Sequence, residues 1–294
     1  MDLFKGVYTA LVTPFDENGK VDYNSLKKLL DKQIEANISG VVINSTTGEG
    51  PSLTKNEKTK IANFVQKYLK NRAKLIISVG FGGFTDVLED IKTFSKYKPD
   101  AILLNLPCYI KPNFSGLSKF VLACINESSV PIILYYVPSR SGQFLNTSQL
   151  LSLINLSPKI IGLKFADSNL AQLAELAKTS NKIIFCGEDS LLEEFLKLGA
   201  TASISVASNA FPKVVASFMA GFKNEDSLAY LNFIKIKAII KSLFLETNPI
   251  LIKHLLNLMG FNVGSTRLPL DFPKVENKNK IKEELFKLKQ QNLV

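Results

Sequence analysis

The sequence predicts an α/β fold: a closed (β/α)8 TIM barrel followed by a C-terminal helical extension. Three observations lead to this prediction. Eight short apolar runs have the composition of buried strands, segments with helical spacing separate them, and no Gly-rich GxGxxG turn follows the first run. Strands that are apolar throughout and alternate with helices form a parallel sheet covered by helices. Eight such units favour a closed barrel over an open dinucleotide-binding sheet.

The elements follow one another in a regular order. The strands are expected at 7–13, 40–45, 75–80, 101–107, 131–138, 160–166, 182–188 and 203–208. Apolar residues recur at helical spacing between them, as in Leu26, Leu29, Leu30 and Ile34, or in Leu170, Leu173 and Leu176. Thr54 and Thr147 are of a type that favours helix N-caps. Beyond about residue 222 only helical patterns follow, so we expect a barrel at 1–222 and an extension at 223–294.

Composition indicates an ordinary globular chain. Of 294 residues, 46% are hydrophobic and 21% are charged, which suffices for a sizeable core. No apolar run has the length of a membrane span, and the N-terminus lacks the pattern of a signal peptide. The three cysteines have no CxxC spacing, which is typical of reduced thiols. We therefore expect a cytoplasmic protein with no membrane partner and no structural metal.

The net charge of +10 raises the question of nucleic-acid binding. Almost all of the positive charge is lysine scattered along the chain, whereas arginine occurs only at Arg72, Arg140 and Arg267. Nucleic-acid-binding proteins favour the planar fork of arginine. Lysine-rich solvated faces are therefore the preferred interpretation, and we expect no nucleic-acid partner.

Lys164 lies in the middle of the apolar run "IIGLKFA". Burial disfavours the charged form of an amine and leaves a nucleophile that can attack a ketone. The protonated Schiff base that results withdraws electrons, so the adjacent carbon can lose a proton and become an enamine. The alternative is a lysine that extends from a strand end to water.

The single histidine, His254, lies in an apolar helical segment. One histidine cannot build a His-rich metal site, and it disfavours Ser-His-Asp and Cys-His mechanisms. Proton transfers must then use other groups, and the hydroxyls of Tyr135, Tyr109 and Thr46 stand at predicted strand ends. For each tyrosine the alternative is a core aromatic with its hydroxyl at the rim.

Two further features are suited to binding carboxylates. In "STTGEG", Thr46 and Thr47 next to Gly48 offer hydroxyl and main-chain donors, although a plain loop is the alternative. Arg140 in "VPSR" is a candidate for a bidentate clamp on a second substrate, with a structural ion pair as the alternative.

Seven motifs in order along nearly the whole chain carry a family resemblance. They are "GVYTALVTPF", "TTGE", "YYVPSRSG", "GLKFADSN", "CGEDS", "ISVASN" and "ETNPILIKHLLNLMG". Together they resemble the pyruvate-dependent class I aldolases of the dihydrodipicolinate synthase and N-acetylneuraminate lyase family.

The resemblance implies a role for each matching residue. Lys164 corresponds to the Schiff-base lysine, pyruvate to the ketone, and Tyr135, Thr46 and Tyr109 to the proton relay, with Tyr109 reaching into a neighbouring subunit's site. The pyruvate pocket corresponds to Thr47 and to the backbone at Gly187 and Ile204. Because Arg140 matches the synthase branch, the resemblance implies condensation of pyruvate with L-aspartate-4-semialdehyde to 4-hydroxy-tetrahydrodipicolinate in lysine biosynthesis. It implies no cofactor and a homotetramer or homodimer.

Alternatives remain open at this point. A sister aldolase such as N-acetylneuraminate lyase would act on a sugar-derived aldehyde, and a non-catalytic ligand-binding barrel would form no adduct. The sequence departs from the family's usual residues at Ser45, Cys108, Tyr136 and Phe165, positions that can shape the pocket. Where lysine-inhibited relatives bind their effector, this chain has Lys55, Lys58, Phe84, Leu88 and Cys108. A cationic effector would be repelled by the added lysines and would miss its polar partners, which predicts weak or absent inhibition by lysine.

Overall fold

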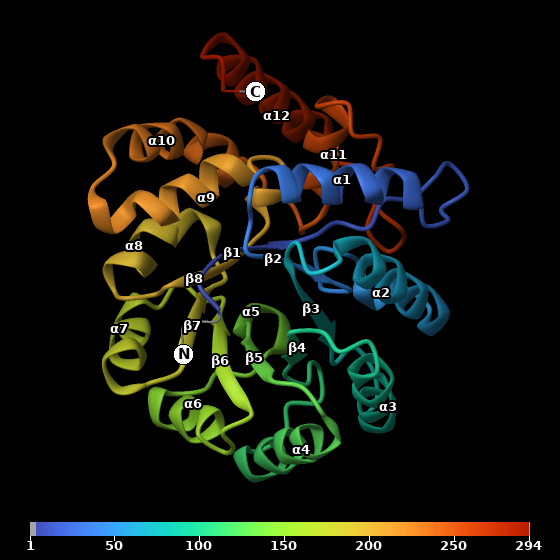
Figure 1. The fold of residues 1–294 in the computed structure, drawn as a ribbon, viewed down its shortest axis with the longest axis vertical. Helices are drawn as coiled ribbons and strands as arrows, with labels where there is room; N and C mark the ends of the chain where they lie inside the picture. The colour runs from blue at the N-terminus through green and yellow to red at the C-terminus, as the bar shows by residue number, and fades with distance from the viewer. Residues whose placement is uncertain (1–3, 294) are drawn as a thin grey trace.

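Eight parallel strands close into a barrel in the computed structural model, which describes residues 4–293 (Figure 1). Each strand pairs with its sequence neighbour, and β8 closes the ring on β1, so the predicted fold class is confirmed. The strands are β1 (Gly6–Ala10), β2 (Gly40–Ile43), β3 (Lys74–Val79), β4 (Ala101–Asn105), β5 (Ile132–Tyr136), β6 (Ile160–Phe165), β7 (Ile183–Cys186) and β8 (Ala202–Ser205).

Helices surround the ring of strands (Figure 1). Those that follow strands within the barrel are α1 (Tyr23–Glu35), α2 (Lys55–Leu69), α3 (Phe84–Ser95), α4 (Phe114–Glu127), α5 (Pro138–Ser141), α6 (Thr147–Ile154), α7 (Leu170–Thr179), α8 (Leu192–Lys197) and α9 (Pro212–Gly221). The cap predicted at Thr54 is confirmed, because Thr54 and Glu57 form a capping box. The cap predicted at Thr147 is wrong. Asn146 accepts from the Gln149 N–H there, and Thr147 is the first helical residue.

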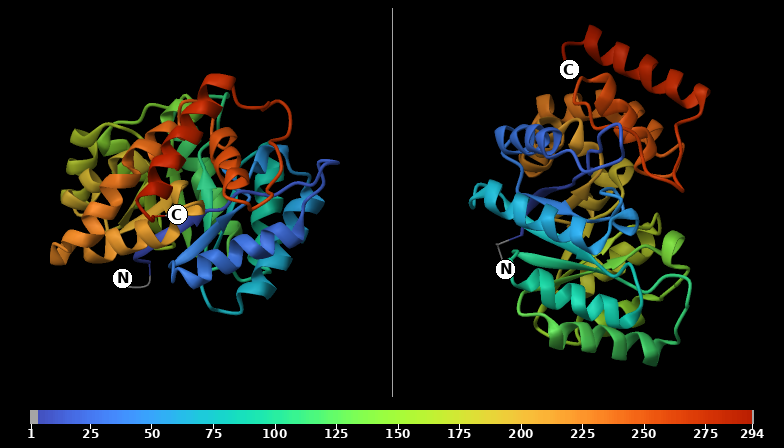
Figure 2. Two further views of the ribbon diagram at one scale, coloured as in Figure 1. Left: turned by 90° about the horizontal axis from the view of Figure 1, so that it is seen from above. Right: turned by 90° about the vertical axis from the view of Figure 1, so that its right-hand side faces the viewer.

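Three more helices follow the barrel: α10 (Ser227–Ser242), α11 (Ile250–Leu258) and α12 (Val275–Gln290). Helix α10 packs on α9 and α12, and α11 packs on α12. Figure 2 shows these helices gathered at one end of the molecule, with α12 outermost. The predicted helical extension is present, while the division of the chain into domains after residue 222 stays a prediction.

Side chains alternate between two cores along each strand. One core fills the barrel interior with residues such as Tyr8, Ile133 and Phe185, and the other lies between strands and helices. This alternation decides which polar residues face the barrel axis. Among the helices of residues 4–293, none has the length and hydropathy needed to cross a membrane.

Candidate active site

A cavity of about 370 Å³ opens where the strands end, at the face where (β/α)8 barrels carry their reactive groups. Larger hollows of about 460 and 620 Å³ lie outside the barrel and contain none of the predicted site residues. The smaller cavity is lined by Ser45, Thr46, Thr47, Tyr135, Val137, Ser139, Arg140, Lys164, Ala166, Gly187, Glu188, Val206, Phe244, Glu246, Thr247 and Asn248. Six of the eight predicted site residues are therefore together.

Lys164 lies on β6 and faces the barrel interior. It is paired in register with Tyr135 on β5, which brings its Nζ to 4.2 Å from the centre of the Tyr135 ring. The lysine is only 6% exposed, yet it lines the cavity. The amine is thus buried against an aromatic face and still open to a small ligand, which disfavours the alternative of a lysine extending into water.

Three of the hydroxyl groups in this cavity belong to predicted site residues. Tyr135 is 6% exposed, Thr47 is buried and Thr46 is partly buried, and all three line the cavity. Thr47 Oγ1 accepts a hydrogen bond from Asn248 Nδ2 at 2.9 Å, so its position is fixed from the C-terminal extension. Tyr135, whose ring lies against Lys164, and Thr46 thus line the same cavity as the amine.

Gly187 lines the cavity at the end of β7. Its N–H donates to the Phe165 carbonyl at 2.9 Å, and a Cβ here would lie 2.7 Å from the Ala166 side chain, so glycine is required for this close approach. Ile204 does not line the cavity. It is buried in the barrel interior, and Val206 lines the cavity instead.

Arg140 lies in the short helix α5 at the cavity rim. Its guanidinium donates to the Asn248 carbonyl at 3.5 Å, and the side chain is exposed. Within residues 4–293 no carboxylate lies within 4 Å of it, and its charge only helps to lower the pKa of Glu188 in the same cavity, which disfavours a structural ion pair. Its positive charge at the rim can attract an anionic ligand to the cavity.

Two carboxyl groups, Glu188 and Glu246, also line the cavity. Burial raises the pKa of Glu188, and the neighbouring charge of Asp189 raises it further, whereas Lys164 lowers it. Asp189 is itself buried, and its carboxylate accepts from the N–H groups of Val206 and Ala207. This carboxylate therefore anchors the loop that follows β8.

Tyr109 does not reach the cavity of its own chain. It lies in the loop after β4 and is 94% exposed. The neighbouring Ile110 is also mostly exposed. Its φ of 68° falls in the left-handed region, which a tyrosine rarely adopts. The loop thus presents an aromatic side chain outward on a strained backbone.

The sequence reasoning missed one wall of the cavity, the connector between α10 and α11. Phe244, Glu246, Thr247 and Asn248 form this wall. The motif "ETNP" was part of the family resemblance, but it had no assigned role. Nothing in the local pattern shows that Asn248 lies beside Thr47, which is 201 residues earlier in the chain.

The four residues that depart from the family pattern, Ser45, Cys108, Tyr136 and Phe165, differ in where their side chains lie. Tyr136 and Phe165 follow the inward-facing Tyr135 and Lys164, so they point outward and pack with ring centres 5.6 Å apart. Only Ser45 lines the cavity, while Cys108 is exposed in the loop before Tyr109. Two departures therefore affect packing between strands and helices rather than the cavity itself.

The sole histidine, His254, lies on α11 and does not line the cavity. Burial lowers its pKa, and nearby Lys278 and Lys282 lower it further. Within the described chain, no three His, Cys, Asp or Glu side chains lie close enough to hold a metal ion. The reactive groups of the cavity are thus an amine, hydroxyls, a guanidinium and carboxyls.

The family model described as the dihydrodipicolinate synthetase family matches residues 3–288. This chain belongs to that family. A relative in sequence is the 4-hydroxy-tetrahydrodipicolinate synthase of Bdellovibrio bacteriovorus, which is 35% identical over 293 residues and covers 98% of this chain and 99% of its own.

Solved structures of the dihydrodipicolinate synthetase family superpose closely on this one. The chloride-inhibited enzyme from Acinetobacter baumannii, complexed with pyruvate, has a TM-score of 0.93 at 30% identity and covers 99% of this chain and 100% of its own. The enzyme from Cyanidioschyzon merolae with lysine bound has a TM-score of 0.93 at 27% identity over the whole of both chains.

Proposed function

We propose that this chain condenses pyruvate with L-aspartate-4-semialdehyde to 4-hydroxy-tetrahydrodipicolinate, a step of lysine (diaminopimelate) biosynthesis. The observation that carries the proposal is the buried Lys164 amine, held against Tyr135 in a cavity that also contains Thr46, Thr47 and Arg140. The names of the relatives support the same reaction. The pyruvate bound in the Acinetobacter baumannii structure supports the ketone.

Lys164 supplies the covalent chemistry and no cofactor takes part. Its amine adds to the keto carbon of pyruvate, water leaves, and a protonated Schiff base forms. Loss of a proton from the methyl carbon gives an enamine, and that carbon attacks the aldehyde carbon of the second substrate. The amino group of the second substrate then attacks the Schiff-base carbon, which closes the ring and releases Lys164.

Hydroxyl groups move the protons in these steps. Tyr135 and Thr46 stand beside Lys164 in the cavity and act as the relay. Thr47, with the backbone at Gly187 and Ile204, forms the pyruvate pocket. Of these, Thr47 and Gly187 line the cavity, which supports their part. Ile204 contributes its backbone alone, because its side chain is buried in the barrel interior.

Arg140 binds the carboxylate of the aldehyde substrate. Its exposed guanidinium at the rim supports this role, since a planar fork pairs with a carboxylate through two parallel hydrogen bonds. The same observation favours aspartate semialdehyde over the sugar-derived aldehyde of an N-acetylneuraminate lyase, which has little use for this arginine.

Tyr109 completes the relay of a neighbouring subunit in a homodimer or homotetramer. Its exposure and its strained outward conformation support a role outside its own cavity. The chain acts in this proposal as a barrel at 1–222 with a helical extension at 223–294. Its location in the cytoplasm stays a prediction.

A coupled assay tests the proposed reaction. The chain is given pyruvate with aspartate semialdehyde, and in parallel pyruvate with N-acetylmannosamine, under matched conditions. Turnover with aspartate semialdehyde and little with the sugar is expected. Preferential use of the sugar would assign the chain to the lyase reaction, and no turnover with either aldehyde would refute both.

A further inference from the structure

Glu49 ends the TTGE loop that carries Thr46 and Thr47. It is only 2% exposed, and its φ of 54° lies in the left-handed region that non-glycine residues rarely adopt. Its N–H donates to the Thr46 carbonyl at 3.0 Å, which closes a turn over the loop. The strained backbone and the buried carboxylate indicate that strong contacts hold this residue in place.

Those contacts come from the C-terminal extension. Lys253 Nζ donates to Glu49 Oε1 at 2.8 Å, and the backbone N–H of Arg267 donates to Glu49 Oε2 at 2.8 Å. Lys253 is 1% exposed and donates also to the Ser265 carbonyl at 2.7 Å. Burial is the main cause that lowers the pKa of Lys253 to about 8; the charge of Glu49 opposes this shift and the charge of Arg267 adds to it.

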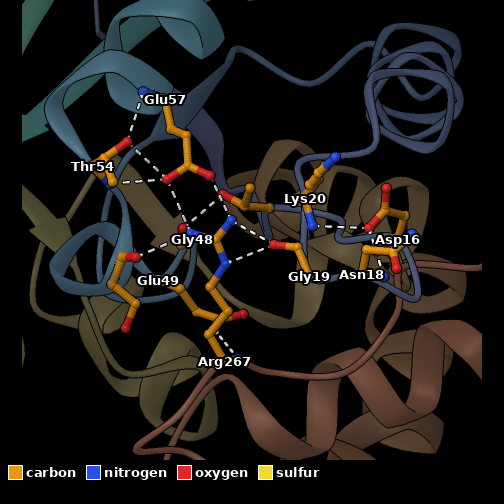
Figure 3. A network of polar contacts seen from close by, with 11 residues as sticks. Asp16, Asn18, Gly19, Lys20, Gly48, Glu49, Thr54, Glu57 and Arg267 are labelled. Carbon is orange, nitrogen blue, oxygen red and sulfur yellow. Dashed lines mark hydrogen bonds and ion pairs between the residues drawn. The ribbon is translucent and has the colours of Figure 1, made fainter.

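Arg267 extends the same network to two other loops, as Figure 3 shows. Its guanidinium donates to the Gly19 carbonyl at 2.6 Å and 3.0 Å, to the Ser52 carbonyl at 3.1 Å, and to both oxygens of the Glu57 carboxylate. The segment that follows α11 is thereby fixed to the β1–α1 loop and to the start of α2.

Helix α11 is consequently attached to the TTGE loop at two points. Asn248, just before the helix, donates to Thr47, and Lys253 within it binds Glu49. Thr47 lines the cavity, whereas Glu49, Lys253 and Arg267 do not. The buried pair therefore has no access to substrate and can act only through the loop.

We propose that Lys253 is a positioning residue: its bond to Glu49 holds the TTGE loop so that Thr46 and Thr47 keep their places beside Lys164. The inference rests on the proposed function, because it assigns a purpose to this loop in the pyruvate reaction. A displacement of about 1 Å of a positioned group can cost about a hundredfold in rate, which makes such a support worthwhile at a reactive site.

The test uses three variants of the full chain. Lys253→Met removes the charge and leaves the Glu49 carboxylate buried without its ammonium partner, which is destabilising. Glu49→Gln combined with Lys253→Met removes both charges, and a neutral pair of similar volume is often tolerated. Lys253→Arg keeps the positive charge but replaces the ammonium group with a larger, planar guanidinium group.

Lys237→Met is the matched control. Lys237 Nζ lies 3.1 Å from Glu193 Oε2 in an ion pair between α10 and α8, and neither residue lines the cavity. The control removes one of the two lysines paired with the buried Glu193, which keeps Lys197, and it does not touch the TTGE loop. It should keep the wild-type rate of adduct formation with pyruvate.

The readouts are the rate at which borohydride traps the pyruvate adduct and the KM values for both substrates, measured on samples that circular dichroism shows to be folded. In the double variant we expect adduct formation about tenfold to a hundredfold slower, with the KM for the aldehyde little changed. Lys253→Arg should lie between this variant and the wild type. A general loss of stability would not slow adduct formation with pyruvate while leaving the KM for the aldehyde unchanged.

Wild-type adduct rates in every folded variant would overturn the proposal, and so would loss of folding in all three, because the pair would then serve stability alone. The wild type separates this failure from failure of the proposed function. If the wild type itself forms no adduct and shows no turnover, the proposed function fails. If the wild type is active and the variants match it, only the positioning role fails.

Discussion

Arg140 is the residue that distinguishes one aldehyde from another in this account. We expect Arg140→Ala to raise the KM for aspartate semialdehyde or to lower turnover by about tenfold to a hundredfold, because a charge-assisted hydrogen bond is lost. Pyruvate adduct formation should stay near the wild-type rate. Steady-state kinetics with each substrate varied in turn measures the difference.

Arg72→Ala is the matched control for that substitution. Arg72 donates to the Leu69 and Tyr68 carbonyls at the end of α2, lies over the Tyr68 ring and does not line the cavity, so its loss should leave both KM values unchanged. If Arg140→Ala unfolds the protein, or impairs pyruvate and the aldehyde equally, the carboxylate role is wrong.

Glu57 links the stability of the chain to pH. Its bond with Arg267, together with hydrogen bonds from Thr54, holds the pKa of Glu57 at about 2, below the ordinary 4.5. The folded state binds the Glu57 proton more weakly than the unfolded state does. The stabilisation from the Glu57 carboxylate is therefore fully present above pH 4.5 and is lost as the pH falls towards 2. Glu57→Gln should lower the free energy of unfolding by about 1.5 to 3 kcal/mol at neutral pH.

Urea denaturation at a series of pH values measures this contribution. The difference between wild type and Glu57→Gln should shrink as pH falls below 4.5. Glu283→Gln on α12 is the control, since its ion pairs are exposed and should contribute little. An equal difference at all pH values would show that Glu57 acts through shape rather than through charge.

At the scale of elements, the strands could be predicted and their ends could not. All eight expected runs are strands, because apolar β-branched segments between helical patterns have one stable arrangement. The expected run 40–45 ends at Ile43 because Asn44 takes a φ of 55°, and 131–138 ends at Tyr136 because Pro138 begins α5. These departures from the sheet form the loops that line the cavity.

The parts of the site that escaped prediction depend on long-range contacts. Lys164 and Tyr135 could be identified because an amine and a hydroxyl are unusual within apolar strands. The connector with Asn248 could not be placed, since its contact with Thr47 depends on how α10 turns back over the barrel. The pairing of Lys253 with Glu49 could not be predicted for the same reason, because it too depends on where the C-terminal helices pack.

The contacts between α2 and α3 bear on inhibition by lysine. Lys55 pairs with Glu89, and Lys58 Nζ lies 3.9 Å from Asp90 Oδ2, so these lysines add no net positive charge and repulsion of the effector is not the reason to expect weak binding. What remains is the absence of polar partners, because Phe84 and Cys108 occupy places where the effector's polar contacts are needed.

We therefore expect weak or no inhibition when lysine is titrated to millimolar concentrations in the coupled assay. The Cyanidioschyzon merolae enzyme, whose structure has lysine bound, is the positive control for binding measured by calorimetry. Clear saturable inhibition of this chain would contradict the prediction and would indicate other contacts for the effector.

At the scale of the whole molecule, the site is proposed to need a second copy of the chain. A mixed dimer of a Lys164→Ala protomer and a Tyr109→Phe protomer tests this. Its site with an intact Lys164 would receive Tyr109 from the other protomer, so activity should return to about half that of the wild type in an isolated mixed dimer. Each variant alone should show at most about a hundredth of wild-type activity.

The control is a mixed dimer of Lys164→Ala and Tyr135→Phe protomers. Both substitutions affect groups that each cavity takes from its own chain, so no intact site can form and activity should not return. Recovery in the control, or none in the test pair, would contradict the sharing of Tyr109 between subunits.

The central claim is that pyruvate reacts covalently with the Lys164 amine. The protein is incubated with pyruvate and borohydride, digested, and the modified peptide is sequenced by mass spectrometry. The account predicts one stable adduct, located at Lys164, that is lost in Lys164→Ala and kept in the Lys237→Met control. An adduct at another lysine, or none in folded wild-type protein, would contradict it.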